Sequence, residues 1–85
     1  MKTQSGIVVL RNLKTDRCFL FYADDIQKAN TEMRFQLDLG MHPCKSLQED
    51  YTNTGLEVFR FDTVELTDNP GRLEEVKAGF PDQYV

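Results

Sequence analysis

Residues 5–12 read Ser-Gly-Ile-Val-Val-Leu-Arg-Asn, and this stretch decides the fold. Its centre, Ile7 to Leu10, is apolar at odd and even positions alike and rich in β-branched side chains. A strand with one solvent-exposed face alternates apolar and polar residues. A run that is apolar at odd and even positions therefore indicates a strand that is buried on both faces. We therefore expect residues 5–12 to form the central strand of a sheet.

The residues after this strand predict a hairpin and then a helix. A polar turn at residues 13–16 leads into a second β-rich run at residues 17–22. Asp24 or Asp25 can cap a helix that ends at Gly40 and carries one narrow apolar stripe: Ile26, Ala29, Met33 and Leu37. Phe35 and Leu39 fall opposite that stripe, so they either contact the next helix, which we expect, or leave a small apolar spot exposed.

The second half of the chain predicts three further elements. Residues 44–54 place Cys44, Leu47 and Tyr51 on one helical face and end before Gly55. Residues 58–66 are strand-like, with Phe59, Phe61 and Thr63 on one parity and Val58, Val64 and Leu66 on the other. A short last helix should begin at Asn69-Pro70 and continue through Ala78.

The element order is therefore ββααβα. It predicts an α+β fold in which a small three-stranded, mostly antiparallel sheet packs with three helices. A chain of 85 residues is too short for two separate cores, so we expect a single domain over residues 1–85. The longest apolar run is Ile7 to Leu10 and no signal-peptide pattern precedes it, so we expect a cytoplasmic protein without membrane contact.

Charge is unevenly spread along the sequence. Residues 1–22 carry Asp16 as their only acid and a net charge of +3, whereas the whole chain has a formal charge of -4. An acidic chain lacks the broad positive field that gives nucleic-acid binders much of their affinity, but a local basic patch still acts within one Debye length, about 8 Å in the cell. The candidate nucleic-acid contacts are therefore Arg11, Lys14 and Arg17 of the hairpin.

Several short strings, taken in one order at similar spacing, resemble the GIY-YIG nuclease domain, a family of homing endonucleases, repair excinuclease subunits and restriction enzymes. The match covers most of the chain, and the series is more informative than any one string. The strings are Gly6-Ile7-Val8, Arg11-Asn12-Leu13, Phe19-Leu20-Phe21, Asp25-Ile26-Gln27-Lys28, Gly40-Met41-His42, Leu47-Gln48, Gly55, Phe59-Arg60-Phe61 and Val64-Glu65.

The resemblance implies a set of cleavage residues that this sequence lacks. In the family, tyrosines of the two signature strands help to activate water, an arginine of the first helix stabilises the scissile phosphate, and a glutamate of a later helix binds a divalent metal. The tyrosine positions match Val8 and Phe19, which have no hydroxyl group, and the arginine position matches Ala29, which has no charge. Phe21 replaces the signature glycine and adds bulk beside the family's cleft. His42 matches a histidine of some family members.

Two residues are candidate substitutes for the missing groups. Tyr22 carries a phenol, but its strand parity is opposite to that of Phe19, so it should face the other side of the sheet. Glu74 or Glu75 lies in the last helix, where the metal-binding glutamate is sought, although simple alignment puts Ala78 at that place. A glutamate in the first turn of a helix is also favoured by the helix dipole alone.

The two cysteines do not indicate a metal site. Cys18, His42 and Cys44 lack a fourth ligand and the paired Cys-x-x-Cys spacing of structural zinc sites. We expect Cys18 and Cys44 to be small core residues with free thiols, and His42 to be a loop residue before Pro43.

Three functions remain open from the sequence. The first is a catalytically inactive GIY-YIG-like domain that acts as a binding or regulatory module, without a cofactor. Its partner would be nucleic acid at the hairpin or a protein that contacts Phe35, Leu39 and the neighbouring acids. The second is an active endonuclease that uses Mg²⁺ or Mn²⁺ and relocated catalytic residues, and the third is an acidic protein that binds proteins or imitates nucleic acid.

Overall fold

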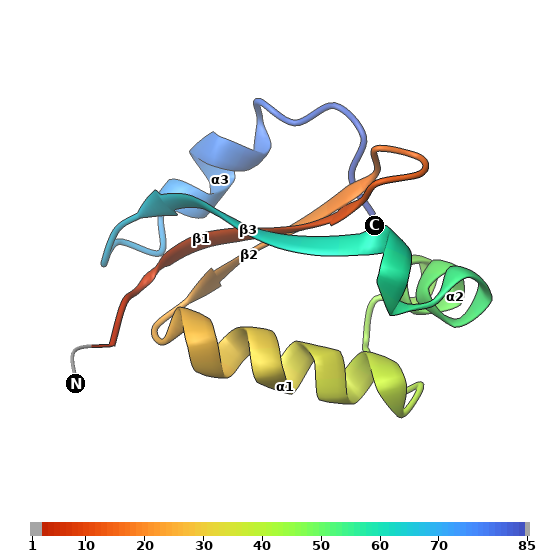
Figure 1. Ribbon diagram of the computed structural model, residues 1–85. Helices are drawn as coiled ribbons and strands as arrows, with labels where there is room; N and C mark the ends of the chain where they lie inside the picture. The colour runs from red at the N-terminus through yellow and green to blue at the C-terminus, as the bar shows by residue number, and fades with distance from the viewer. Residues whose placement is uncertain (1–2, 85) are drawn as a thin grey trace.

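The structure, a computed structural model, describes residues 3–84 except for the side chain of Leu56. Strands β1 (Gly6–Asn12), β2 (Cys18–Ala23) and β3 (Phe59–Leu66) form an antiparallel sheet in the order β2-β1-β3. Helices α1 (Ile26–Asp38) and α2 (Lys45–Thr54) pack on one side of the sheet, and α3 (Arg72–Lys77) packs on the other (Figure 1). The predicted α+β fold and the order ββααβα are confirmed.

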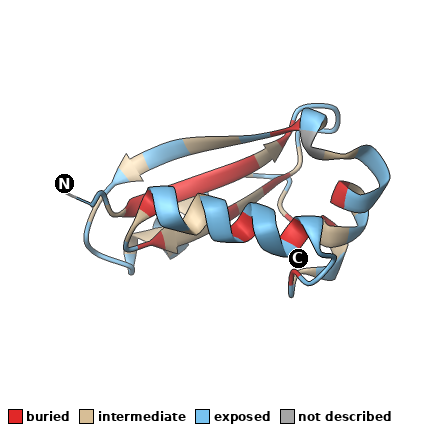
Figure 2. Ribbon diagram, turned by 60° about the horizontal axis from the view of Figure 1, so that its bottom comes forward, coloured by how far each residue is buried: buried red, intermediate tan, exposed pale blue. Residues whose placement is uncertain are grey.

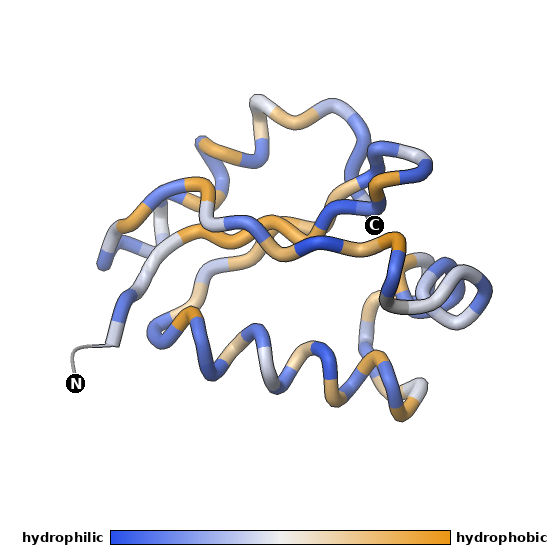
Figure 3. Tube along the Cα trace, in the orientation of Figure 1, coloured by the Kyte–Doolittle hydropathy of each residue, from blue (hydrophilic) through white to orange (hydrophobic). Residues whose placement is uncertain are grey.

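β1 is the central strand, as its apolar residues on both parities predict. Figure 2 shows it as a buried stripe between its two neighbours, and Figure 3 shows the hydrophobic residues gathered along the strands. Ile7 and Val9 pack toward α3, whereas Val8 and Leu10 pack toward α1 and α2. The two faces of β1 therefore belong to two different layers of the core.

Gly6, the first residue of β1, lies against β3. A side chain at Gly6 would collide with the carbonyl oxygen of Glu65, so the close approach of the two strands requires glycine here. The register between β1 and β3 shifts between Ile7 and Val8. The shift brings Leu66 opposite Gly6 and Thr63 opposite Val8, so the simple alternation expected for residues 58–66 fails in its last residues.

The hairpin between β1 and β2 is held by Asn12. Its Oδ1 accepts hydrogen bonds from the amides of Lys14 at 2.9 Å and Thr15 at 3.2 Å, and Asp16 takes the left-handed conformation with φ 62°. β2 begins at Cys18, one residue later than expected. The end of the chain pairs beside it, where Cys18 donates to Asp82 O and accepts from Tyr84 N.

The helix ends follow local sequence signals closely. Asp25 caps α1 by accepting from the amide of Lys28 at 3.2 Å, and the backbone turns out of the helix at Gly40, where φ is 73°. Cys44 is the N-cap of α2, and Gly55, with φ 82°, follows its last residue. The apolar stripes of both helices are buried against the sheet, at Ile26, Met33, Leu37, Leu47 and Tyr51.

Three expected details are wrong. Val58 lies in a short 3-10 turn, η1 (Leu56–Val58), and not in β3. α3 begins at Arg72 with Gly71 as its N-cap, because Asn69 Oδ1 accepts from the amide of Gly71 and forms a separate turn first. The expected contact of Phe35 with the next helix does not form: Phe35 is 65% exposed and Leu39 is 55% exposed, so the apolar spot is open to solvent.

Within residues 3–84, no helix is long and apolar enough to cross a membrane.

Candidate functional site

The positions matched to the family's cleavage residues lie on the side of the sheet that faces α1. Val8 is opposite Phe21 of β2, and Leu10 is opposite Phe19, so all four side chains share that face. Val8 is fully buried, 0% exposed, in a cluster with Ala23 and Ile26. Phe21, Ala29 and Phe61 pack against this cluster. The structure therefore places Val8 and Ala29 in and around one apolar cluster.

His42 joins this face from the loop between α1 and α2. Its ring meets Phe19 edge-on with ring centres 5.3 Å apart, and Phe19 in turn lies 6.2 Å from Phe21. His42 lies in a loop, as expected, but it is 8% exposed and belongs to the buried residues. An aromatic series of two phenylalanines and one histidine thus covers the α2 end of the site.

The environment of His42 favours its neutral form. Burial lowers the pKa of His42 below its usual value, because a charged ring loses hydration there. The amide of Cys44 donates to Nδ1 at 3.0 Å, so Nδ1 is the accepting nitrogen and the ring proton lies on Nε2. Among Val8, Phe19, Ala29 and His42, only His42 could accept a proton, and one of its two nitrogens is already engaged.

The candidate substitutes lie away from this face. Tyr22 packs against the cluster of Ile7, Val9 and Leu20 on the α3 side of the sheet. Glu74 is exposed in the first turn of α3, which lies on that same opposite side. No group of three or more potential metal ligands occurs within residues 3–84. Neither residue is placed near Val8, Phe19 or Ala29.

Glu75 takes part in an ion-pair network that ties α3 to β3. Arg72 donates to Glu65 with Nε at 2.7 Å and Nη2 at 2.8 Å, and its Nη1 donates to Glu75. The hydrogen bonds from Arg72 lower the pKa of Glu65, and the partner carboxylates raise the pKa of Arg72. Glu75 therefore has Arg72 as a structural partner.

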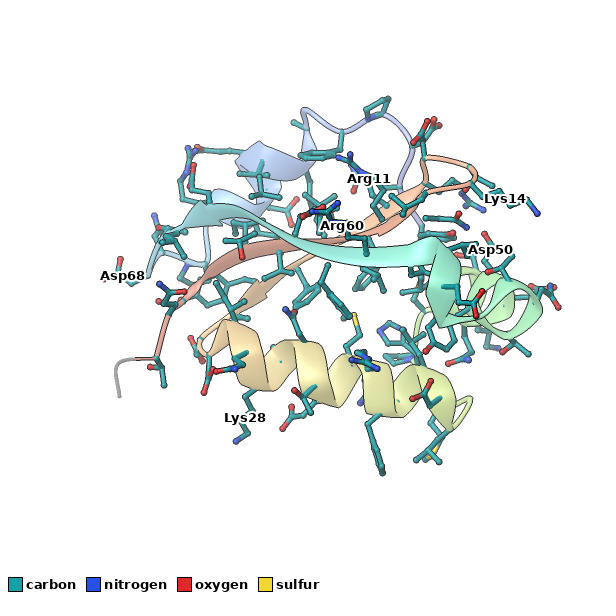
Figure 4. All side chains as sticks on the ribbon, viewed as in Figure 1. Arg11, Lys14, Lys28, Asp50, Arg60 and Asp68 are labelled. Atoms are coloured by element: carbon teal, nitrogen blue, oxygen red, sulfur yellow. The ribbon has the colours of Figure 1, made fainter. Side chains whose placement is uncertain are left out.

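The three basic residues of the hairpin do not form one patch. Arg11 is on the α3 side of the sheet, directly opposite Arg60 of β3 (Figure 4). Arg17 lies on the other side, where its guanidinium carbon is 4.4 Å from the centre of the Tyr84 ring and Nη1 is 3.8 Å from Asp50 Oδ2. Lys14 is exposed in the turn between them. Arg60, which the sequence reasoning missed, is the basic residue nearest to Arg11 in register.

Asp38 is a second residue that sequence reasoning missed. It is the last residue of α1, and its Oδ1 accepts a 2.5 Å hydrogen bond from the hydroxyl group of Tyr51 on α2. The sequence offered one signal for Asp38: it is an acid at the C-terminal end of a helix, where the negative end of the helix dipole disfavours an acid. Neither α1 nor α2 has a basic residue in its last turn that would offset this.

Two solved structures with this fold are nuclease domains. The catalytic domain of intron endonuclease I-TevI, in a glutamate-to-alanine mutant, is 25% identical with a TM-score of 0.76, over 91% of this chain and 78% of that chain. The catalytic domain of homing endonuclease I-TevI is 24% identical with a TM-score of 0.78, over 88% of this chain and 82% of that chain. No family model matches the sequence, and no curated protein matches it. The chain thus has the fold of the catalytic domain of a GIY-YIG homing endonuclease.

Proposed function

We propose that this chain is a catalytically inactive GIY-YIG-like domain that acts as a binding module. The observation that carries the proposal is the apolar cluster of Val8, Ala23 and Ile26, with Phe21, Ala29 and Phe61 packed against it. Val8 takes a position that the resemblance assigns to a tyrosine, and Ala29 takes the position that it assigns to an arginine. A filled, apolar wall offers no donor to a phosphate and no group that activates water.

The size of the expected loss supports an inactive site. Phosphodiester hydrolysis requires an activated water and stabilisation of the charge that develops on phosphate. Removal of one electrostatic donor commonly costs a factor of about 10² to 10³ in rate, and losses within one site compound without adding simply. With Val8, Phe19 and Ala29 in these positions, activity falls to background, and the domain needs no Mg²⁺ or Mn²⁺.

Contact with nucleic acid would be weak and local in this proposal. Arg11 and Lys14 are the available cations at the hairpin end of the sheet, whereas Arg17 is already paired with Asp50. Arg60 likewise lies 3.3 Å from Asp62. A protein partner is therefore favoured over nucleic acid.

The proposal is tested with supercoiled plasmid incubated with purified protein and either Mg²⁺ or Mn²⁺. We expect the plasmid to stay supercoiled, while a metal-dependent nuclease in the same buffers relaxes it. Nicking that copurifies with the protein, stops with a chelator and is lost in Glu74→Ala or Tyr22→Phe would establish an active site elsewhere on the fold. That outcome would replace the proposal with a relocated endonuclease.

A further inference from the structure

A pocket of about 460 Å³ opens between the C-terminal ends of α1 and α2. Residues 37–40 line it from the end of α1, and Tyr51, Thr52 and Gly55 line it from α2. It is separate from the apolar cluster of Val8, Ala23 and Ile26, and neither Val8 nor Ala29 lines it. The proposed function does not use this pocket.

The electrostatics of the pocket favour a cation. Two helices present their C-terminal turns to it, each equivalent to about half a negative charge, and neither turn contains a basic residue. The carboxylate of Asp38 adds a full charge. Its Oδ1 accepts from Tyr51, and within residues 3–84 its Oδ2 has no hydrogen bond and no ion pair within 4.0 Å. Burial, followed by the hydrogen bond to Asp38, raises the pKa of Tyr51 to about 12, so Tyr51 remains a donor and leaves the charge on Asp38.

The surrounding sequence has the same sign of charge. Residues 36–57 contain four acids, Asp38, Glu49, Asp50 and Glu57, against the single lysine Lys45. Arg34 lies one helical turn before Asp38 but forms no ion pair with it in the described part of the chain. At the pocket itself, a positively charged group is attracted by Asp38 and by the C-terminal ends of the two helices.

Exposed apolar side chains flank the same pocket. Phe35, Leu39 and Met41 are 65%, 55% and 69% exposed, and they fall within seven consecutive residues. Of these, Leu39 lines the pocket itself, and Phe35 lines a smaller hollow that shares Asp38 with it. Thr31 and Arg34 complete the lining of that smaller hollow, so the apolar surface beside Asp38 also adjoins one cation, Arg34. Such a surface is typical of protein contacts.

We propose that this surface binds a protein segment in which a lysine or arginine stands beside an apolar residue. The cationic head group pairs with Asp38 at the negative ends of the two helix dipoles, while its aliphatic stem and the apolar neighbour cover Leu39 and Phe35. This inference deepens the proposed binding role by naming the class of partner. It commits to a basic and apolar peptide and not to a second copy of the chain, because two copies of this surface would bring two Asp38 carboxylates together.

The experiment uses a random-peptide display library as the probe against the folded 85-residue protein. We expect the enriched peptides to carry a lysine or arginine next to an apolar residue, and to shift the amide signals of residues 37–40, Tyr51 and Thr52. Replacement of the basic residue by norleucine, which keeps the stem and removes the charge, should weaken binding by about tenfold, a change of roughly 1.4 kcal/mol.

Matched variants separate charge from folding. Asp38→Asn keeps an oxygen that accepts from Tyr51 but removes the charge, so binding should weaken about tenfold. Asp68→Asn removes the same charge at the far end of the molecule (Figure 4) and should leave binding unchanged. Leu39→Ser should weaken binding with no change in the oligomeric state. The inference is overturned if no peptide is selected, or if the selected peptides lack a basic residue. It is also overturned if the peptides bind the Asp38→Asn variant equally well, or if the protein self-associates and Leu39→Ser abolishes that association. The plasmid assay reports separately on the absence of catalysis, so either proposal can fail without the other.

Discussion

The hydroxyl group of Tyr51 donates a 2.5 Å hydrogen bond to Asp38, which joins the end of α1 to α2. The ring of Tyr51 also packs 5.5 Å from the ring of Phe59 at the start of β3. Gln48 completes the connection, since its Nε2 donates to Leu37 O at 2.9 Å and its Oε1 accepts from the amide of His42 at 3.1 Å. Two side chains of α2 therefore position the end of α1, the following loop and the pocket between the helices.

Tyr51→Phe should lower the free energy of unfolding by about 1 kcal/mol, because it removes one hydrogen bond to a charged acceptor and leaves the ring in place. Urea unfolding measures the change. Tyr22→Phe is the matched control, since the hydroxyl group of Tyr22 has no hydrogen bond within residues 3–84. Equal stability of the two variants would show that the bond to Asp38 contributes nothing measurable.

The same residue predicts a loss of stability in alkali. The pKa of Tyr51 is raised to about 12 in the folded protein from an ordinary value of 10.0, so the unfolded chain loses this proton first as the pH rises. The contribution of Tyr51 is complete below about pH 10 and is lost as the pH rises toward 12. Unfolding midpoints measured across this range should fall more steeply for the wild type than for Tyr51→Phe. Parallel curves would contradict the assignment.

His42 predicts a loss of stability in mild acid. Its folded-state pKa is lowered by burial from 6.5, so the unfolded chain takes up a proton first as the pH falls. Its contribution is complete above about pH 6.5 and is lost as the pH falls through the folded-state pKa. His42→Gln should therefore show a shallower fall in stability between about pH 7 and 5. His42 is the only histidine in the sequence, so an imidazole titration followed by NMR identifies its pKa directly.

Val8→Tyr should lower the free energy of unfolding by about 1 to 3 kcal/mol, because Val8 is fully buried and an aromatic ring has to displace the side chains of Ala23, Ile26 and Phe21. Thr63→Tyr is the control: Thr63 lies directly opposite Val8 on β3 but is exposed, so its change should stay within about 0.5 kcal/mol. A Val8→Tyr protein as stable as the wild type would mean that the face retains room for the family's phenol.

Both cysteines are free in the structure, as the sequence predicts. A thiol reagent should modify Cys44 first in the native protein, because Cys44 is half-buried whereas Cys18 is buried and donates from Sγ to Asp82 O at 3.3 Å. Burial also raises the pKa of Cys18, which lowers its thiolate fraction. Cys44→Ser should remove the fast phase. Modification of Cys18 at the same rate as Cys44 would indicate that the end of the chain opens readily from β2.

Binding of duplex DNA should be weak, and its affinity should fall with salt as for roughly two to four phosphate contacts. Fluorescence anisotropy with a short labelled duplex measures this slope. Arg11→Gln should reduce affinity more than Arg17→Gln, because Arg17 is already close to Asp50. A larger loss with Arg17→Gln would place the contact on the α2 side of the sheet.

Features with a local cause followed from the sequence alone. The run Ile7 to Leu10 predicted a central strand, because covering both faces of a strand leaves no position for a polar side chain. Asp25, Gly40 and Gly55 predicted helix ends, because an N-cap acceptor and a left-handed residue act within one turn. The sequence also predicted that Val8, Phe19 and Ala29 stand at the positions that the resemblance assigns to two tyrosines and an arginine.

Only the tertiary structure decided which of these residues meet. Arg11 and Arg17 are six residues apart, yet the turn at Asp16 and the pairing of the strands place them on opposite faces of the sheet. Tyr84 reaches Asn12 and Asp50 from the end of the chain, and Asp38 meets Tyr51 across a loop. Such contacts depend on strand register and on the angle between packed helices, which are determined by the whole core together. The local spacing of residues in the sequence determines neither the strand register nor the angle between packed helices. The pocket at Asp38 could therefore be identified only from the folded structure.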